Sequence, residues 1–279
     1  MRDRPPSFLP KVLPAVRALN SLHTNKRWGR VDRMPANRLN DSALGVIERP
    51  VLAWIADRLP LSVTPDHLTL IGIAGALTAA AGYFASHWSL QWLWLASAGL
   101  VINWIGDSLD GTVARLREIQ RPRYGFFVDH TSDLFSQTLV FVTLGLSPCA
   151  HFSIACLGLI AFLMAFVYSL ICVEVRDTLR VTYFGFGPTE IRALLIAGNL
   201  ITLRAGVFDV GQAFALRAWF GPVTIYEITI VILFTIAVPA LAMLALRERR
   251  DLAIEDPPRV PLMTGDSVSR DVGAIAESP

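Results

Sequence analysis

Charged residues are scarce in this chain, and their scarcity excludes most soluble folds. Asp, Glu, Lys and Arg make up only 17% of the 279 residues, whereas 53% are hydrophobic. A soluble domain typically carries about 25% charged residues. The composition and the mean hydropathy of +0.48 therefore indicate a protein of the bilayer. The net charge is only +2, and no basic run is interleaved with aromatic residues, so no nucleic acid partner is expected.

Cysteine is also rare and shows no metal-ligand spacing. The three cysteines, Cys149, Cys156 and Cys172, lie in or beside hydrophobic stretches and are expected to pack as small apolar groups. The N-terminal region lacks a continuous apolar core followed by a small-residue cleavage site, so no signal peptide is expected. No internal repeat or second domain is apparent. The protein is therefore expected to stay in the membrane through its own helices.

Long apolar stretches dominate the chain from residue 68 onwards. A helix needs about 20 predominantly apolar residues to cross the hydrocarbon core. Six stretches qualify approximately, at residues 68–86, 90–107, 129–146, 151–173, 191–207 and 223–246. The fifth is the weakest because Asn199 and Arg204 interrupt it, so it is expected to be short, tilted or partly lining a cavity. The pattern predicts an all-α fold, an integral membrane bundle of six transmembrane helices.

Lys and Arg residues are divided unevenly between the two sides of the predicted bundle. All but two of the 25, Arg204 and Arg217, fall before residue 68, in the loops 111–128 and 174–192, or after residue 246. Because positive residues favour the cytoplasmic side of a membrane, both termini and these two loops are expected to face the cytoplasm.

Residues 43–59 place apolar side chains such as Leu44, Val51 and Leu52 between charged ones. This spacing predicts an amphipathic helix on the cytoplasmic interface, broken or started at Pro50. The alternative is a soluble cap packed on the bundle. Residues 1–42 and 247–279 are polar and lack a clear period, so both tails are expected to be disordered. The membrane domain then covers residues 43–246.

Four aspartates lie where two of the predicted helices meet the cytoplasm. Asp107 and Asp110 are three residues apart, and Asp129 and Asp133 are four apart, so each pair shares one face of a helix. Ionised carboxylates at the end of an apolar helix are costly unless a positive group lies among them. Hard oxygen ligands without His or Cys suit Mg²⁺ or Mn²⁺ better than Zn²⁺. The aspartates therefore predict a divalent metal site that also attracts phosphates.

The segment from Asp107 to Asp133 resembles the motif of the CDP-alcohol phosphatidyltransferase family, D-x-x-D-G-x-x-A-R followed by G-x-x-x-D-x-x-x-D. Every fixed position is filled, by Asp107, Asp110, Gly111, Ala114, Arg115, Gly125, Asp129 and Asp133. The resemblance implies a membrane enzyme that transfers a substituted phosphate from a CDP-alcohol to an acceptor hydroxyl and releases CMP. It also implies that all four aspartates bind metal, that Asp133 serves in addition as the general base, and that the enzyme forms a homodimer, as relatives often do.

Several residues around the aspartates are candidates for substrate binding. The small residues Gly111, Ala114 and Gly125 would leave room for a nucleotide, although glycines also serve helix packing. Arg115 can give a two-pronged contact to phosphate. The segment at residues 64–69 resembles an entry pattern of the same family that touches the nucleotide, although it equally predicts a helix cap formed by Thr64 or Asp66 with Pro65 in the first turn. The candidates for contact with the CDP-alcohol donor are therefore Gly111, Ala114, Arg115, Gly125, Asp66, Thr69 and Arg121.

The acceptor is expected to bind near the loop 174–192. Arg176, Arg180 and Arg192 are candidates to contact a polar head group, because relatives bind the second substrate here. The alternative is that these are ordinary cytoplasmic positive residues beside a helix start at Thr189. His130, directly after Asp129, points weakly to choline or ethanolamine phosphotransferases, and a histidine that faces a neighbouring helix is the simpler interpretation.

The identity of both substrates stays open at this level. The donor is either CDP-diacylglycerol with a small polar acceptor, or a CDP-linked small alcohol with diacylglycerol as the acceptor. A transporter that binds a cation through the aspartates is an alternative from another class. Two features count against it, since all four acids cluster at one end of the helices and no paired broken helices mark a midplane site. A scaffold derived from the family would have lost an aspartate, and none is lost.

Overall fold

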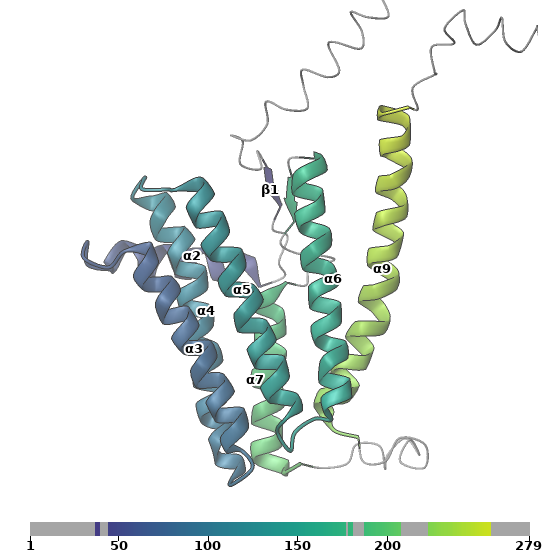
Figure 1. Ribbon diagram of the computed structural model, residues 1–279. Coiled ribbons are helices and arrows are strands. Elements are labelled where there is room, and N and C mark those ends of the chain that lie inside the picture. Colours follow the sequence, from purple (N-terminus) through teal and green to yellow (C-terminus); the bar gives the residue numbers. More distant parts are fainter. Residues whose placement is uncertain (1–36, 40–43, 177, 181–186, 208–222, 258–279) are drawn as a thin grey trace, which may run out of the picture. The chain divides into compact units, whose positions relative to one another are not determined.

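The computed structural model describes residues 37–39, 44–176, 178–180, 187–207 and 223–257 (Figure 1). These residues are mainly helical, with two three-residue strands and the connecting turns, so the all-α prediction is confirmed at the level of fold class. The elements in chain order are β1 (Asn37–Leu39), α2 (Gly45–Arg58), α3 (Pro65–Ala85), the 3₁₀ turn η1 (Leu90–Trp92), α4 (Leu93–Leu116), α5 (Pro122–Gly145), α6 (Phe152–Arg176), β2 (Thr178–Arg180), α7 (Pro188–Ala205) and α9 (Ile225–Glu255). Most of both predicted tails lies outside the described residues.

Each predicted apolar stretch is occupied by one helix, but the helices differ from the predicted spans in length. Helices α3, α6 and α9 are long and apolar enough to cross a membrane. Helix α4 continues past Asp107 to Leu116, and α5 begins at Pro122, before Asp129. The aspartates are therefore inside helices and not at their ends. The structure supports three candidate spans, and the six-span arrangement remains a prediction.

The strands β1 and β2 pair in parallel, with Asn37 opposite Thr178 and Leu39 opposite Arg180. Sequence did not predict this pair, because three residues are too few for a period of two to show. The pairing brings part of the predicted N-terminal tail next to the end of α6. Helix α9 also continues to Glu255, beyond the predicted domain boundary at residue 246.

The start of α3 follows the capping prediction. The Thr64 hydroxyl accepts a hydrogen bond from the backbone of His67, and the His67 ring accepts one from the backbone of Thr64. Pro65 occupies the first turn, where its missing N–H costs nothing. The cap fixes where α3 begins, and therefore where Thr69, one turn later, lies along the helix axis.

Helices α3 and α4 touch backbone to backbone along most of their length. Added Cβ atoms at Gly75, Gly82, Gly99 and Gly106 would clash with the backbone of the opposite helix. Small residues of this kind let membrane helices approach closely, where packing rather than the hydrophobic effect drives association. At the motif end the same contact reaches Asp107, whose backbone nitrogen lies 3.2 Å from a Cβ built at Gly72.

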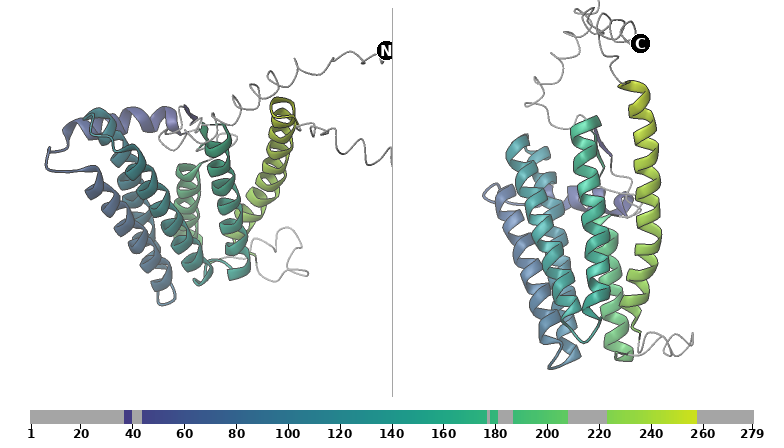
Figure 2. Two further views of the ribbon diagram at one scale, coloured as in Figure 1. Left: turned by 45° about the horizontal axis from the view of Figure 1, so that its top comes forward. Right: turned by 45° about the vertical axis from the view of Figure 1, so that its right-hand side comes forward.

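Helix α2 runs crosswise to α3 and α4 (Figures 1 and 2). Its buried residues Leu52 and Ala56 pack with Leu68, Leu109 and Val113 of the crossed helices. Val46 and Trp54 remain exposed on the outer side. A helix is thus present here, while its amphipathic placement on the interface stays a prediction. The prediction that Pro50 breaks or starts it was wrong, since Pro50 lies inside α2.

The chain divides into two compact units, residues 1–234 and 235–279. In the first unit, α4 packs against α2, α3 and α7, while α5 packs against α3 and α6. Away from the aspartates, Asn199 of α7 is fully buried, donates to Ser97 and accepts from the hydroxyl of Tyr226. The polar residue that weakened the fifth predicted span therefore faces the protein interior. Cys149 and Cys172 are buried, in agreement with packing as small apolar groups, and none of the three cysteines forms a disulfide with another described residue.

Candidate active site

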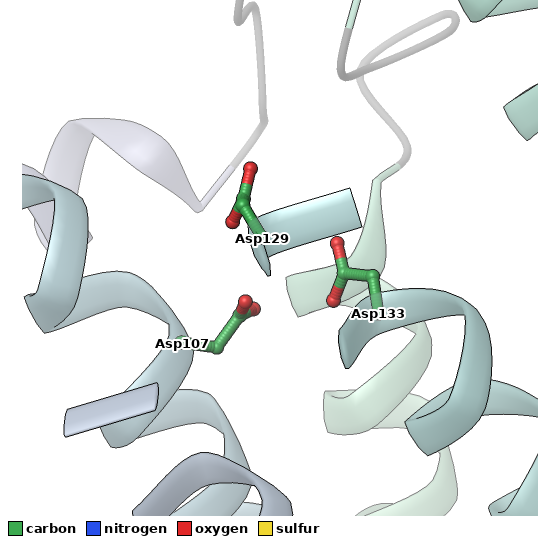
Figure 3. Close-up of side chains that lie close together, drawn as sticks. All are labelled: Asp107, Asp129 and Asp133. Atoms are coloured by element: carbon green, nitrogen blue, oxygen red, sulfur yellow. The ribbon is translucent and has the colours of Figure 1, made fainter. Parts of the chain in front are cut away.

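Asp107, Asp129 and Asp133 point toward one another from two adjacent helices (Figure 3). Each offers one carboxylate oxygen, and these oxygens all lie within 4.8 Å of one another. Asp107 comes from α4, and the other two come from successive turns of α5. All three side chains are partly buried. Asp107 of α4 thus meets Asp129 and Asp133 of α5.

Asp110 takes a different position from the other three aspartates. It is 9% exposed and accepts a hydrogen bond of 2.7 Å from the hydroxyl of Thr69. Its other oxygen accepts from the backbone N–H of Gly111. Asp110 is therefore outside the group of three carboxylates found among the described residues, and it holds α4 to α3 beside them.

Arg192 lies among the aspartates. Its side chain is 3% exposed and donates to Asp107 at 2.9 Å, with Asp133 at 3.6 Å. Its Nε is buried and has no hydrogen-bond partner among the described residues. Arg192 lies in the first two turns of α7, which begins at Pro188 and packs against α4. The guanidinium offsets part of the charge of the clustered carboxylates.

The motif glycines and Arg115 lie beside this group. A Cβ built at Gly125 would meet no atom within 4 Å among the described residues. The atoms nearest to a Cβ built at Gly111 would be those of the Arg115 guanidinium, which also donates to Thr112. Ala114 is half-buried one turn beyond Asp110. Helix packing therefore does not account for either glycine.

Asp66 and Arg121, two candidates for donor binding, pair with each other. A nitrogen of the Arg121 guanidinium lies 2.5 Å from one Asp66 oxygen and 2.6 Å from the other. The guanidinium also lies over the ring of Tyr124, and the hydrogen bonds to Asp66 raise its pKa above the ordinary value. Both side chains are largely exposed. The pair joins the starts of α3 and α5 at the aspartate end of the bundle.

The remaining candidates have less defined places. Arg176 ends α6 and is half-buried, while the side chain of Arg180 lies outside the described part of the structure. His130 stacks on Phe126 and also contacts Phe166 of α6, while its Nδ1 lies 3.4 Å from Asp129. Its ring therefore faces a neighbouring helix, in agreement with the simpler interpretation.

A small polar cavity opens beside the carboxylates and continues along the helices. Its walls include hydroxyls, an amide and two of the aspartates, from α3, α4 and α5: Thr69, Gly72, Ile73, Asn103, Asp107, Ser132, Asp133 and Ser136. Asn103 and Ser136 lie one turn or less beyond Asp107 and Asp133, away from the motif end of the helices. These polar side chains extend the candidate site from the carboxylates toward Asn103 and Ser136.

The residues present fit a divalent cation. Three carboxylates from two helices supply hard oxygen ligands, and neither His nor Cys joins the cluster that the structure describes. Such donors suit Mg²⁺ or Mn²⁺ rather than Zn²⁺. The charge of three neighbouring carboxylates exceeds what one guanidinium can offset, so a cation would be held strongly here.

Glu48 was not singled out from the sequence, yet it lies next to the site. Its carboxylate accepts hydrogen bonds of 2.9 Å from the Trp104 indole and from the Ser108 hydroxyl. Ser108 directly follows Asp107 in the chain. In the sequence, Glu48 appears only as one polar position of an amphipathic helix, and no local signal shows which helix it meets.

Comparisons with known proteins agree with this geometry. A family model described as CDP-alcohol phosphatidyltransferase matches residues 62–226, which include all four aspartates and Arg192. Phosphatidylinositol phosphate synthase of Cutibacterium acnes is 37% identical over 97 residues, 34% of this chain and 44% of the relative. Archaetidylinositol phosphate synthase of Methanothermobacter thermautotrophicus is 34% identical over 108 residues, 37% of this chain and 51% of the relative. The chain thus spans about half the length of the curated relatives it matches. Since the family model covers more than half of the chain, the protein belongs to the CDP-alcohol phosphatidyltransferase family.

Proposed function

We propose that this protein transfers a substituted phosphate group from a CDP-alcohol to an acceptor hydroxyl and releases CMP, as a step of phospholipid synthesis. The observation that carries the proposal is the convergence of Asp107, Asp129 and Asp133 from two helices. Membership of the family supports the reaction class. Asp107, Asp129 and Asp133 gather in one cluster and are not spread along the helices, which fits a site for chemistry better than a path for ions across the membrane.

The proposed roles of the carboxylates follow from their positions. Asp107, Asp129 and Asp133 would hold Mg²⁺ or Mn²⁺, with Asp110 beside them. When bound, such a cation offsets negative charge on the phosphates and on the departing CMP. Asp133 would take the proton from the acceptor hydroxyl as that oxygen attacks the β-phosphorus of the CDP-alcohol. Asp133 borders the cavity together with Asp107, and its assignment as the base rests on the resemblance to the family.

The donor is proposed to bind at the motif end of the two helices. The space at Gly125 and Gly111 would admit the pyrophosphate close to the backbone, with Ala114 leaving room for the nucleotide. Arg115 would contact phosphate. Asp66 and Arg121, joined at the starts of α3 and α5, would form one border of this region, and Thr69 would act through its hydrogen bond to Asp110.

The acceptor is proposed to be an inositol phosphate, with a CDP-activated lipid as the donor. Both matched relatives are named for synthesis of a lipid that carries inositol phosphate. A phosphate on the acceptor would explain a buried arginine with an unpartnered Nε beside the carboxylates, because guanidinium groups bind phosphate by two-pronged contacts. Arg192, with Arg176 and Arg180 as further candidates, would thus distinguish this acceptor from an uncharged alcohol.

The membrane arrangement proposed here has six spans, formed by α3, α4, α5, α6, α7 and α9. Both termini and the aspartates would face the cytoplasm, with α2 on the interface and the membrane domain at residues 43–246. The strongly uneven distribution of Lys and Arg supports this orientation. A homodimer is proposed from the family alone.

The purified protein should be incubated with CDP-diacylglycerol and inositol phosphate in the presence of Mg²⁺ or Mn²⁺. Release of CMP and formation of a phosphatidylinositol phosphate, both abolished by EDTA, are expected. Parallel reactions with free inositol, and with CDP-choline plus diacylglycerol, separate the acceptor proposal from the reaction class. An Asp133→Asn variant should release no CMP while remaining folded. Cation flux in vesicles without CMP release would favour a transporter instead.

A further inference from the structure

One carboxylate, that of Glu48, joins three helices beside the active site. It lies in the first turn of α2 and accepts from Trp104 and Ser108 of α4, at 2.9 Å each. The hydroxyl of Thr189, in the first turn of α7, lies 3.4 Å from both of its oxygens. Helices α2, α4 and α7 therefore meet at a single side chain.

A second glutamate makes the return connection from α7 to α2. Glu190 is 6% exposed, and one of its oxygens accepts from the backbone N–H of Leu44 at 3.1 Å. The other accepts from the backbone N–H of Gly187 at 2.8 Å. Leu44 is the N-cap of α2 and has no side-chain oxygen to cap its own helix. Each of the two helix starts thus donates a hydrogen bond to a glutamate of the other helix.

These contacts involve residues that are close in the chain to Asp107 or to Arg192, which form an ion pair. Ser108 follows Asp107 directly, and Trp104 lies one turn before it. Thr189 precedes Arg192 by three residues, which places both on neighbouring positions of one helix face. We propose that Glu48 is a positioning residue, which holds the α4 turn of Asp107 and the α7 turn of Arg192 at the separation that the acceptor requires. This inference rests on the proposed function of the same site.

Loss of Glu48 would act through its partners. The Trp104 indole and the Ser108 hydroxyl are partly buried, so removal of their acceptor leaves donors that must find another partner or stay unpaired. Groups that orient metal ligands from behind typically change metal affinity or activity by about 10- to 100-fold. The expected effect of Glu48 is at the lower end of that range, because none of its donors is itself a proposed ligand.

The test compares the steady-state kinetics of Glu48→Leu, Glu48→Gln and Asp57→Asn, measured by CMP release with inositol phosphate varied at saturating CDP-diacylglycerol. Glu48→Leu should raise the KM for inositol phosphate about tenfold. Glu48→Gln should stay within about twofold of the wild type, since its amide oxygen still accepts hydrogen bonds. Asp57→Asn, an exposed acid on the same helix, should match the wild type. Wild-type kinetics in Glu48→Leu would overturn the inference, whereas an inactive wild type would count against the proposed function.

Two further variants separate positioning from a general loss of folding. Thr189→Val removes only the α7 donor, whereas Trp104→Phe removes the indole donor together with part of the ring that packs on the cluster of Leu109 and Val113. Each should raise the KM for inositol phosphate severalfold, and Thr189→Val should do so with an unchanged Tm. In a double-mutant cycle, Glu48→Leu combined with Arg192→Lys should cost little more than Arg192→Lys alone. Multiplicative effects would show that Glu48 acts independently of Arg192, and a Tm loss in every variant without a KM change would show that Glu48 serves stability only. Either result would overturn the inference.

Discussion

Helix α4 has two sides that are built in opposite ways. Toward α3, glycines and alanines bring the two backbones into direct contact, and no room for a Cβ is left at Gly75, Gly99 or Gly106. Toward α5, at the motif end, carboxylates from the two helices face each other across a polar cavity. The side of α4 toward α3 leaves no space between the two backbones. The side toward α5 carries neighbouring negative charges, whose repulsion only a positive group can offset. The closely packed pair of α3 and α4 thus supplies Asp107, one of the three clustered carboxylates.

Glycine has a different use on each side. At the α3–α4 contact it is required by the neighbouring backbone, whereas Gly125 has open space where its side chain would be. The same residue type therefore indicates packing in one place and room for a ligand in the other. Sequence spacing alone does not distinguish a glycine needed for packing from one that leaves room for a ligand, whereas substitution by alanine does.

Removal of one carboxylate should have the largest effect. Saturating Mn²⁺, at about 100 times its Kd, should stabilise the wild type by about 2.7 kcal/mol. Asp129→Ala should lose this stabilisation, because one of the three proposed ligands is gone. Thermal unfolding in detergent, with and without Mn²⁺, measures the effect, and Asp57→Asn serves as a control. An equal Mn²⁺-dependent rise of Tm in Asp129→Ala would mean that the cation binds elsewhere.

Gly99→Ala tests the packed side. The added Cβ would clash with the backbone of Ala79, so the helices must separate, at a cost of about 1–3 kcal/mol for overpacking. Alanine favours a helix over glycine by about 1 kcal/mol, which opposes the loss only partly. The Tm of the detergent-solubilised protein should therefore fall. An unchanged or higher Tm would show that α3 and α4 leave room for a Cβ at Gly99.

Gly125→Ala is the matched change on the open side. It carries the same gain in helix propensity without a clash, so the Tm should stay the same or rise slightly. The methyl group should instead obstruct the donor and raise the KM for CDP-diacylglycerol severalfold, a change of about 1 kcal/mol. Kinetics and Tm on one preparation give both results. A normal KM would place the pyrophosphate away from Gly125.

Asn199→Leu should have the smallest effect and tests the region away from the aspartates. The variant loses the hydrogen bonds to Ser97 and Tyr226. Hydrogen bonds between membrane helices average about 0.6 kcal/mol, so a modest decrease in Tm is expected. CMP release should be unchanged, because this network makes no described contact with the carboxylates. A large loss of activity would indicate coupling between the two regions.

The fold class and the meeting of Asp107 with Asp129 and Asp133 were predictable because both follow from short periods in the sequence. The same spacing also predicted Asp110 among them, whereas packing turns its carboxylate to Thr69 of α3. The extension of α4 to Leu116 was not predictable from hydropathy, since Asp107 and Asp110 end the apolar run without ending the helix. Likewise Pro50 continues α2, because tertiary packing of Leu52 and Ala56 outweighs the cost of one proline.

The partner of Arg192 could not be predicted from the sequence. It was expected near the acceptor on account of its charge and loop, but its ion pair with Asp107 joins residues 85 positions apart. The same holds for Glu48, whose partners on α4 and α7 are far away in the chain. Local patterns predict which face a residue occupies, and only the packing of helices decides which partner it meets.

The backbone contact between α3 and α4 also limits how the length of the chain can change. Gly75 meets Asn103, Gly99 meets Ala79 and Gly82 meets Ala96, so the two helices are in a strict antiparallel register. One residue inserted between Gly72 and Gly82 would rotate the rest of α3 by about 100° and turn these glycines away from α4. Insertions and deletions should therefore be tolerated in the connecting loops and rejected within this pair of helices.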